Sequence, residues 1–207
     1  MLTLCFKGGP CRQVEMCECI PSPMEPQIQS LDSLHSILSD YQIDYSHWGQ
    51  NATKSIEKLW EEIELDETSI RIEEGEISRV VSVANVYVKY KSAEGECLQL
   101  WEDRQVFTNG DVRKRDGFNY IAEKGYSSED KLEWAARALK EELQIGIPKS
   151  RIQILGDEIK LGKKTSYPGL KSKYHVHEFE VLLAEDEFKQ EGYVEEQKDK
   201  KTYFVWR

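Results

Sequence analysis

The 207-residue sequence has few basic residues and no long apolar segment. It contains 28 Lys and Arg against 38 Asp and Glu, and the resulting formal net charge of −10 excludes a strongly cationic nucleic-acid binder. No stretch approaches the roughly 18 to 20 consecutive apolar residues that a membrane-spanning helix needs. The first residues also lack the apolar run of a signal peptide. We therefore expect a protein that is not embedded in a membrane and is located in the cytoplasm.

Motifs that cradle phosphates or activate a serine are missing as well. The sequence contains no G-x-G-x-x-G, no Walker loop and no serine elbow. Of the five cysteines, four lie within the first twenty residues, and their spacing matches no standard zinc site. Because three prolines follow between Ile20 and Gln29, we predict a disordered leader over residues 1–30. Metal capture and a redox role are the alternatives for its thiols.

Acidic residues concentrate in the N-terminal part of the chain. Residues 1–77 hold 5 basic and 15 acidic residues, whereas residues 78–207 hold 23 of each. Such an asymmetry predicts two segments with different roles. We therefore assign an acidic helical extension to residues 31–77 and a compact domain to residues 78–207. The extension is a candidate surface for a protein partner, although solvated helix faces would have the same composition.

Two amphipathic helices are predicted in the extension. Apolar residues repeat at helical spacing across residues 31–41, where Ser30 or Asp32 could provide the cap. The second helix is predicted by an apolar stripe opposite a row of carboxylates, which indicates that it docks on an apolar surface. The stripe consists of Ile56, Leu59, Trp60 and Ile63.

The domain is predicted to begin and end with strands. Residues 79–91 and 97–107 have strand composition, and Asn109-Gly110 then indicates a tight hairpin. A helix follows from about Ser128 to Leu143, and the spacing of Ser127 and Asp130 suggests a capping box at its start. Further strands are predicted at residues 152–155, 174–183 and 201–206. Strands, one helix and strands again predict an α/β or α+β fold. The buried stripe of the helix is predicted as Leu132, Ala135, Ala136, Leu139 and Leu143.

One face of this helix carries a row of charges. Glu129, Glu133, Arg137 and Glu141 recur every four residues, and Glu142 lies one position further round. Mg²⁺ typically takes one or two carboxylates and completes its shell with water and substrate phosphate. The face therefore suits a Mg²⁺ site for phosphate chemistry. A salt-bridged helix surface remains the simpler interpretation of the spacing alone.

The stretch from 123 to 145 resembles the Nudix box, G-x5-E-x7-R-E-U-x-E-E-x-G-U, in which U is an aliphatic residue. Three positions differ: Glu123 and Gln144 replace glycines, and Ala138 replaces the Glu that follows the Arg. The box is therefore degenerate. Six positions agree, namely Glu129, Arg137, Leu139, Glu141, Glu142 and Ile145.

The resemblance implies an α/β fold over residues 78–207, a Nudix-like mixed sheet sandwiched by helices with an N-terminal helical extension. Nudix domains commonly close with a helix after the last strand. Here that helix is either absent or replaced by the helices of the extension, and we favour replacement because the apolar stripe of the second helix needs a partner. Activity in this family means hydrolysis of phosphoanhydrides in nucleoside diphosphate-linked compounds. Carried over, the catalytic residues are Glu141, Glu142 and Arg137, and the ligands of Mg²⁺, or of Mn²⁺ in its place, are Glu129, Glu141 and Glu142.

Ala138 bears directly on this implied activity. In the family, the Glu residues at the positions of Ala138 and Glu142 both bind the metal, so the resemblance implies a weakly held ion here. Two hypotheses follow. The chain is either a Mg²⁺-dependent pyrophosphohydrolase or a catalytically inactive Nudix-fold module for ligand sensing or protein interaction.

Basic residues outside the box are candidates for substrate binding. A lysine-rich loop spans residues 160–173, and a second basic spot follows the hairpin turn. Lysine binds phosphate as a point charge and loops commonly carry binding residues, so we expect a nucleotide or other phosphorylated small molecule as partner, and neither a membrane nor a nucleic acid. Solvated loops are the alternative. The candidates are Lys163, Lys164, Lys171, Arg113 and Arg115.

Two histidines and three tryptophans complete the set of candidates. His175 and His177 would share one face of a strand and could chelate a metal or act as acid and base, but strand packing explains them equally. Trp101, Trp134 and Trp206 lie on predicted elements, where a core position is favoured over a base-stacking platform.

Overall fold

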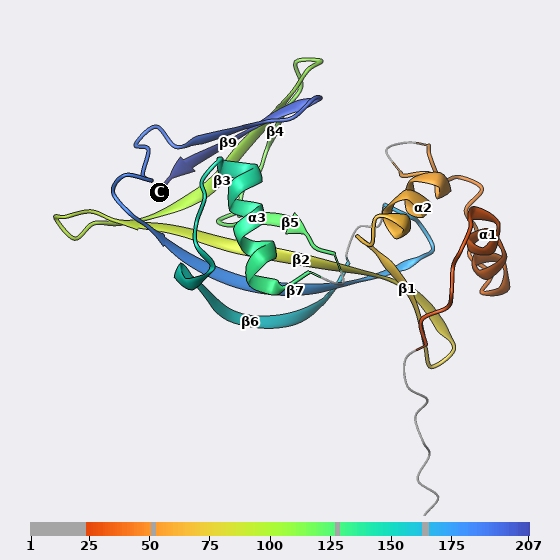
Figure 1. The fold of residues 1–207 in the computed structure, drawn as a ribbon. Helices are drawn as coiled ribbons and strands as arrows, with labels where there is room; N and C mark the ends of the chain where they lie inside the picture. The colour runs from red at the N-terminus through yellow and green to blue at the C-terminus, as the bar shows by residue number, and fades with distance from the viewer. Residues whose placement is uncertain (1–23, 51–52, 127–128, 163–165) are drawn as a thin grey trace, which may run out of the picture.

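The structure, a computed structural model, describes residues 24–50, 53–126, 129–162 and 166–207. These residues form a long twisted sheet with helices against its middle and at one end (Figure 1). The helical elements are α1 (Leu31–Asp40), α2 (Ile56–Glu64), α3 (Lys131–Leu143) and a 3-10 turn, η1 (Lys149–Arg151). The strands are β1 (Ser69–Glu73), β2 (Glu76–Lys91), β3 (Cys97–Phe107), β4 (Val112–Lys114), β5 (Ile121–Lys124), β6 (Ile152–Leu161), β7 (Lys171–Leu183), β8 (Tyr193–Glu196) and β9 (Lys200–Trp206).

The sheet is mixed, as the α/β prediction requires. Its strand order is β6-β7-β2-β3-β9-β8, and β1 and β5 pair with β2 while β4 pairs with β3. The long strands β2 and β7 run parallel from Ser78 opposite Lys171 to Tyr90 opposite Leu183. The other pairings are antiparallel. A mixed sheet flanked by helices is therefore confirmed.

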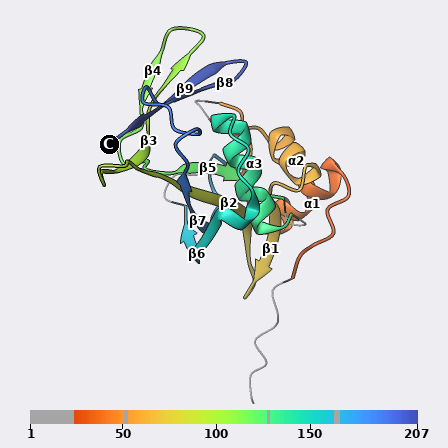
Figure 2. The ribbon, with the colours of Figure 1, turned by 60° about the vertical axis from the view of Figure 1, so that its left-hand side comes forward.

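The main core lies between α3 and the sheet, where α3 packs on β2 and β5 (Figure 2). Side chains alternate along a strand, so Ala84, Val86 and Val88 face α3 together. The buried face of the helix differs from the predicted stripe. Trp134 and Ala138 are buried although neither belongs to that stripe, and two of its predicted members are only partly buried. Its fully buried residues are Trp134, Ala135, Ala138, Leu139 and Leu143, and its partly buried ones are Leu132 and Ala136.

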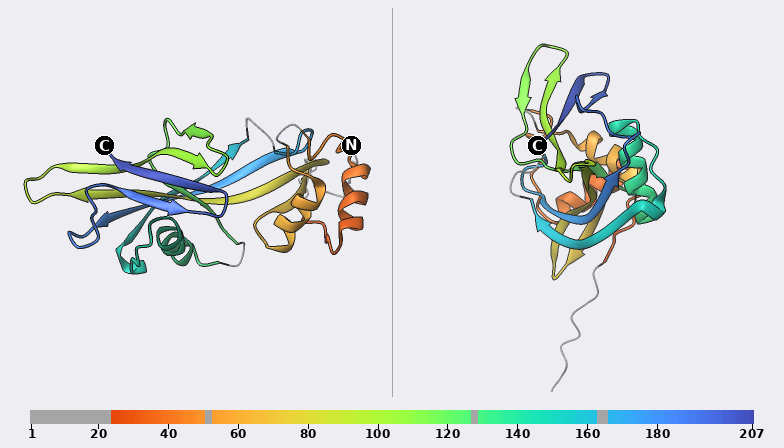
Figure 3. Two further views of the ribbon diagram at one scale, coloured as in Figure 1. Left: turned by 90° about the horizontal axis from the view of Figure 1, so that it is seen from above. Right: turned by 90° about the vertical axis from the view of Figure 1, so that its left-hand side faces the viewer.

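A second core forms at one end of the sheet, where α1 and α2 lie beyond the middle of the strands (Figure 3). Ser30 caps α1 and Ser55 caps α2 by accepting backbone hydrogen bonds in the first turn. Leu34, Leu38 and Leu59 are completely buried there against Ile70 of β1 and Tyr167. Both predicted helices of the extension are present, and they form an apolar cluster with β1, the start of β2, Tyr167 and Leu170.

The expectation that these helices replace a closing helix is wrong for the middle of the sheet. The apolar stripe of α2 is satisfied by α1 and by the end of the sheet, so it covers the start of β2 only. Further along β2, Val83 and Asn85 face away from α3 and line an open pocket together with Val176 of β7. This face is therefore left accessible.

Several predicted boundaries shift. Residues 73–76 form the tight turn between β1 and β2, in which Glu74 and Gly75 have positive φ. The boundary placed after Ile77 consequently lies inside β2. Helix α3 begins at Lys131 because Asp130 accepts hydrogen bonds from the backbone of Leu132 and Glu133. Ser127 and Ser128, where the start was predicted, lie outside the described residues.

The end of the predicted leader is anchored. Met24 and Ile72 exchange backbone hydrogen bonds of 3.0 and 2.9 Å, and the neighbouring Glu25 pairs with Arg71 at 2.7 Å. Residues 1–23, which include the four leader cysteines, lie outside the described residues.

Candidate functional site

Arg137 organises the charged face of α3. Its guanidinium donates two hydrogen bonds of 2.9 Å to the two carboxylate oxygens of Glu129 and one of 3.0 Å to Glu141. It also donates to the carbonyl of Lys124 at 3.0 Å, which ties the loop before the helix to its middle turn. Burial would lower the pKa of Arg137, but the hydrogen bonds and charges of Glu129 and Glu141 outweigh it and raise that pKa. Arg137 thus bridges carboxylates, as its spacing predicted.

The predicted ligands Glu129 and Glu141 are therefore already occupied. Both oxygens of Glu129 and one oxygen of Glu141 accept hydrogen bonds from the same guanidinium, and the ring of Tyr126 lies 4.9 Å from its carbon. Bidentate Arg–carboxylate pairs are strong and geometrically specific. A cation at this face would have to compete with Arg137 for the same oxygens.

Glu142 has a different environment from the other two carboxylates. It is half-buried at the end of α3 and meets Glu195 of β8, with Glu123 of β5 close enough to interact electrostatically. Burial raises the pKa of Glu142 most, and the like charge of Glu195 and its hydrogen bond raise it further. Burial also raises the pKa of Glu123, against the opposing charge of Arg137. The pKa of Glu142 is thus raised above the usual range of a carboxyl group.

Sequence reasoning missed Glu195 and Glu123 as members of this group. Glu123 stands at the position of the first Gly of the box, and only the pairing of β5 with β2 shows that its side chain shares a face with Ala84. Glu195 lies in a four-residue strand without any motif, and β8 reaches α3 only in three dimensions.

Ala138 lies one helical turn before Glu142, on the same stripe of α3. Its side chain is completely buried in the main core. A carboxylate at this position would point into apolar surroundings, and burying an unpaired charge there would be costly. The departure from the box is therefore a packing change as well as the loss of one carboxylate.

These residues do not fit the metal that the resemblance implies. Across residues 24–50, 53–126, 129–162 and 166–207, no group of three or more His, Cys, Asp or Glu side chains is arranged to hold a metal ion. The donor chemistry agrees, because Arg137 binds Glu129 and Glu141, and burial beside Glu195 raises the pKa of Glu142. A divalent cation needs deprotonated oxygen ligands that are free to coordinate.

The basic candidates are not brought together. Lys171 begins β7 and pairs with Glu76 at 2.5 Å, at the end of the sheet where α1 and α2 lie. Arg113 is exposed on β4, and Arg115 pairs with Glu102 at 3.0 Å and stacks on the ring of Phe118. Because β4 pairs with β3, these arginines are on a different part of the sheet from Lys171. Lys163 and Lys164 lie outside the described residues.

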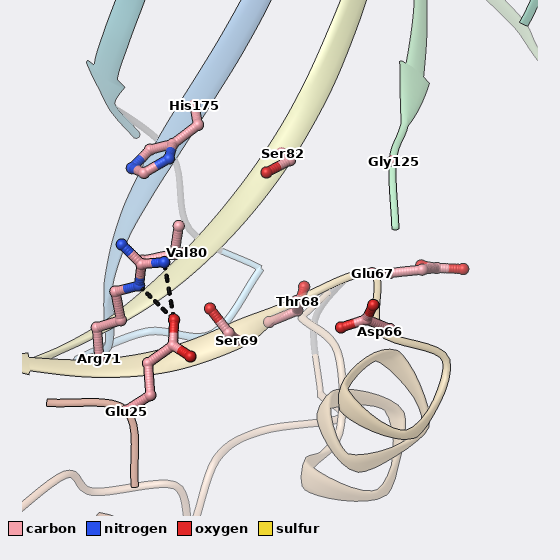
Figure 4. Close-up of a pocket in the computed structure, with 10 residues that line it drawn as sticks. All are labelled: Glu25, Asp66, Glu67, Thr68, Ser69, Arg71, Val80, Ser82, Gly125 and His175. Carbon is pink, nitrogen blue, oxygen red and sulfur yellow. Dashed lines mark hydrogen bonds and ion pairs between the residues drawn. The ribbon is translucent and has the colours of Figure 1, made fainter. Parts of the chain in front are cut away.

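His175 and His177 lie on the same face of β7 but contact different residues. His177 lies 2.6 Å from Asp157 through Nδ1 and packs its ring edge-on to Trp134 at 5.5 Å. His175 lines a small polar pocket of about 120 Å³ between β1, β2 and β7 (Figure 4). The pKa of His175 is lowered, and burial is the largest cause. In that pocket the guanidinium of Arg71 points at Glu25. The pocket is too small for a nucleotide, since small-molecule sites typically enclose about 300 Å³ or more.

The tryptophan predictions hold in part. Trp134 is buried in the main core, whereas Trp101 and Trp206 are only partly buried. Trp206 packs with the rings of Tyr90, Phe188 and Tyr193, and the guanidinium of Arg207 lies over Trp101.

Comparison with known proteins gives a loose structural likeness. No protein-family model and no curated protein matches the chain. An Ap4A hydrolase from C. elegans in a binary complex aligns at 15% identity with a TM-score of 0.35, over 60% of this chain and 77% of that one. A MutT/nudix family protein from Enterococcus faecalis aligns at 13% identity with a TM-score of 0.42, over 87% of this chain and 56% of that one. The MERS1–RNA complex of T. brucei aligns at 19% identity with a TM-score of 0.30, over 48% of this chain and 34% of that one. All three TM-scores are below 0.5, and the likeness concerns the fold.

Within the described residues, none of the helices combines the length and the hydropathy needed to cross a bilayer.

Proposed function

We propose that this chain is a Nudix-related protein that binds a nucleoside diphosphate-linked compound without hydrolysing it. The observation that carries this proposal is the neutralisation of the acidic face of α3 from within the protein. Arg137 holds Glu129 and Glu141, and burial beside the like charge of Glu195 raises the pKa of Glu142. Position 138, at which the Nudix box has a further Glu, holds Ala138, whose side chain is completely buried in the main core.

The choice of ligand class rests on the six box positions that agree and on the Arg137–Glu129 pair, which orders the loop and helix of the box. These features support descent from a protein that handled nucleoside diphosphates. This chain lacks a set of free carboxylates that could hold a metal ion. Their loss affects hydrolysis of the ligand more than binding of the ligand.

One observation favours the competing function, a Mg²⁺-dependent pyrophosphohydrolase. Glu123 and Glu195 add carboxylates near Glu142 that the box does not contain. A protein partner for the acidic extension is compatible with both functions.

The test is Mg²⁺-dependent or Mn²⁺-dependent phosphate release from a panel of dinucleoside polyphosphates and nucleoside diphosphate sugars. We expect the wild-type protein and Glu142→Gln to show the same background release. Release that requires the cation and disappears in Glu142→Gln would contradict the proposal. Ala138→Glu is expected to destabilise the protein rather than restore activity, because position 138 has no exposed surface.

A further inference from the structure

The face of β2 and β7 that points away from α3 contains an open pocket of about 620 Å³. This volume lies within the range of about 300 to 1,000 Å³ that is typical of small-molecule sites. Val83 and Val176, which pair in register across the two parallel strands, form part of its floor. The pocket exists because α1 and α2 pack at the end of the sheet and leave this part of the face open.

Aromatic side chains form the walls of the pocket. Phe118 and Tyr120, from the segment before β5, lie with ring centroids 5.6 Å apart, and Tyr120 is also supported edge-on by Tyr87 at 5.6 Å. Tyr174 of β7 lines the pocket from another side and makes no ring contact with the other described aromatic residues. A planar ligand in the pocket can therefore stack on Tyr174.

Gly162 sets the position of the Tyr174 ring. A Cβ atom added at Gly162 would lie 2.9 Å from Cε2 of Tyr174 and 3.3 Å from Cβ of Ser172. The absence of a side chain at Gly162 thus allows the ring to lie where it faces the pocket.

Asn85 supplies the polar group at the bottom of the pocket. Asn85 is only 4% exposed and is among the residues that line the pocket. A side-chain amide offers two donor hydrogens and one acceptor oxygen. A ligand that offers both a donor and an acceptor on one edge would pair with it, as the edge of a nucleobase does.

Lys160 of β6 supplies a positive charge at the pocket. It is the one cationic residue among the described residues that line the pocket, and the carboxylates of Glu158 and Glu178 lie close enough to interact with it. The exposed ammonium of Lys160 pairs with Glu158, outside the lining, so it can turn toward a ligand at little cost.

From these observations we infer that this pocket binds the nucleobase of a nucleotide, stacked on Tyr174, with its edge at Asn85 and its phosphate toward Lys160. The inference rests on the proposed function for the choice of a nucleotide, and it locates the base on the face of the sheet opposite to α3. The base site is therefore separate from the acidic residues of the box.

The test is calorimetric titration of the full chain, in EDTA, with AMP, GMP and UMP, and with ribose 5-phosphate and adenosine as partial ligands. We expect at least one nucleotide to bind about tenfold more tightly than ribose 5-phosphate, because stacking of a base on an aromatic ring contributes substantially. Tyr174→Ala should weaken that nucleotide about tenfold or more. Tyr203→Ala, which removes a tyrosine on β9 outside the pocket, is the matched control and should bind as the wild type does.

Two further variants test the polar contacts. Asn85→Ala should reduce the difference in affinity among the three bases, and Lys160→Ala should weaken the nucleotide toward the affinity of adenosine. Circular dichroism checks folding, and Tyr174→Leu, which keeps an apolar side chain, replaces the alanine variant if that variant unfolds. The inference is overturned if no nucleotide binds more tightly than ribose 5-phosphate, or if the Tyr174 and Tyr203 variants bind alike.

The two proposals fail in different ways. Hydrolysis that needs Mg²⁺, together with weaker binding in Tyr174→Ala, would end the proposed function and leave the base pocket standing. No hydrolysis, together with binding that Tyr174→Ala does not change, would end the base pocket alone.

Discussion

At the scale of single residues, Glu142 differs most from its neighbours on α3. Its pKa is raised by burial and by Glu195, so the folded protein keeps a proton that the unfolded chain releases. A carboxyl group with a raised pKa in the folded state makes stability fall as pH rises, from the ordinary pKa of Glu toward the raised one. The residue therefore couples the stability of this region to pH.

We predict that the urea midpoint of the wild-type protein decreases between about pH 5 and about pH 9, and that Glu142→Gln flattens this decrease. The amide of Gln stays neutral and can still donate to Glu195. Glu141→Gln, on the same turn but bound to Arg137, should retain the pH dependence of the wild type. A Glu142→Gln variant with an unchanged pH profile would show that Glu142 is ionised in the folded protein.

Gly125 is the second residue with a specific packing role. A Cβ atom there would lie 2.4 Å from the indole of Trp134, which is buried in the main core. Gly125→Ala should therefore push Trp134 out of place and destabilise the protein by about 1–3 kcal/mol, the usual cost of overpacking. Gly146→Ala, at a glycine whose Cβ would meet nothing within 4 Å, is the control for equilibrium unfolding. Equal midpoints for the two variants would mean that the indole moves freely.

Residue roles could be predicted from sequence only where the partners share a helix or its cap. The contacts of Arg137 with Glu129 and Glu141 follow from spacings of eight and four residues, and they are present. Glu195 lies more than fifty residues from Glu142, so no local pattern could indicate their contact. The burial of Ala138 depends on how α3 rotates on the sheet, which its helical period alone leaves open.

At the scale of elements, α2 is joined to the sheet by a buried ion-pair network around Glu62. Glu62 is 2% exposed and pairs with Lys54, with Lys124 of β5 at 3.0 Å and with Arg79 of β2 at 3.4 Å. Burial would raise the pKa of Glu62, but the hydrogen bonds and charges of Lys54 and Lys124 lower it overall. Its stabilising contribution is thus lost as pH falls through this lowered value.

Removing this carboxylate should be costly. We predict that Glu62→Ala destabilises the protein by about 3–5 kcal/mol, because it leaves the buried guanidinium of Arg79 without its partner. Glu61→Ala, which removes an exposed carboxylate paired with Lys58, should change stability by no more than about 0.5 kcal/mol. Chemical denaturation compares them. Similar losses in both variants would show that the network is not what holds α2 in place.

Elements with strong local signals were predicted well. Both helices of the extension, β3 and the turn at Asn109-Gly110 agree with the structure, because their apolar period or turn chemistry is contained in a few adjacent residues. The strands β1, β5 and β8 were missed, since each is at most five residues long and depends on its neighbour in the sheet. The parallel pairing of β2 with β7 spans residues too distant for any sequence pattern to register.

At the scale of the whole molecule, the two clusters of apolar residues meet along β2. Its first residues belong to the cluster of α1 and α2 and its later ones to the cluster of α3, so one strand links the extension to the domain. We predict that a chain starting near residue 75 is less stable than the full chain, because it exposes Ile77 and Tyr167. Thermal unfolding of both chains tests this, and equal midpoints would assign the extension no role in stability.

The central claim is that this protein binds a nucleoside diphosphate-linked compound and leaves it intact. The most direct measurement combines calorimetric titration with a dinucleoside polyphosphate or a nucleoside diphosphate sugar and mass spectrometry of the ligand recovered after incubation with Mg²⁺ or Mn²⁺. The account predicts saturable binding that does not require the cation and full recovery of uncleaved ligand. Binding that appears only with the cation, or recovery of the cleaved nucleotide, would contradict it.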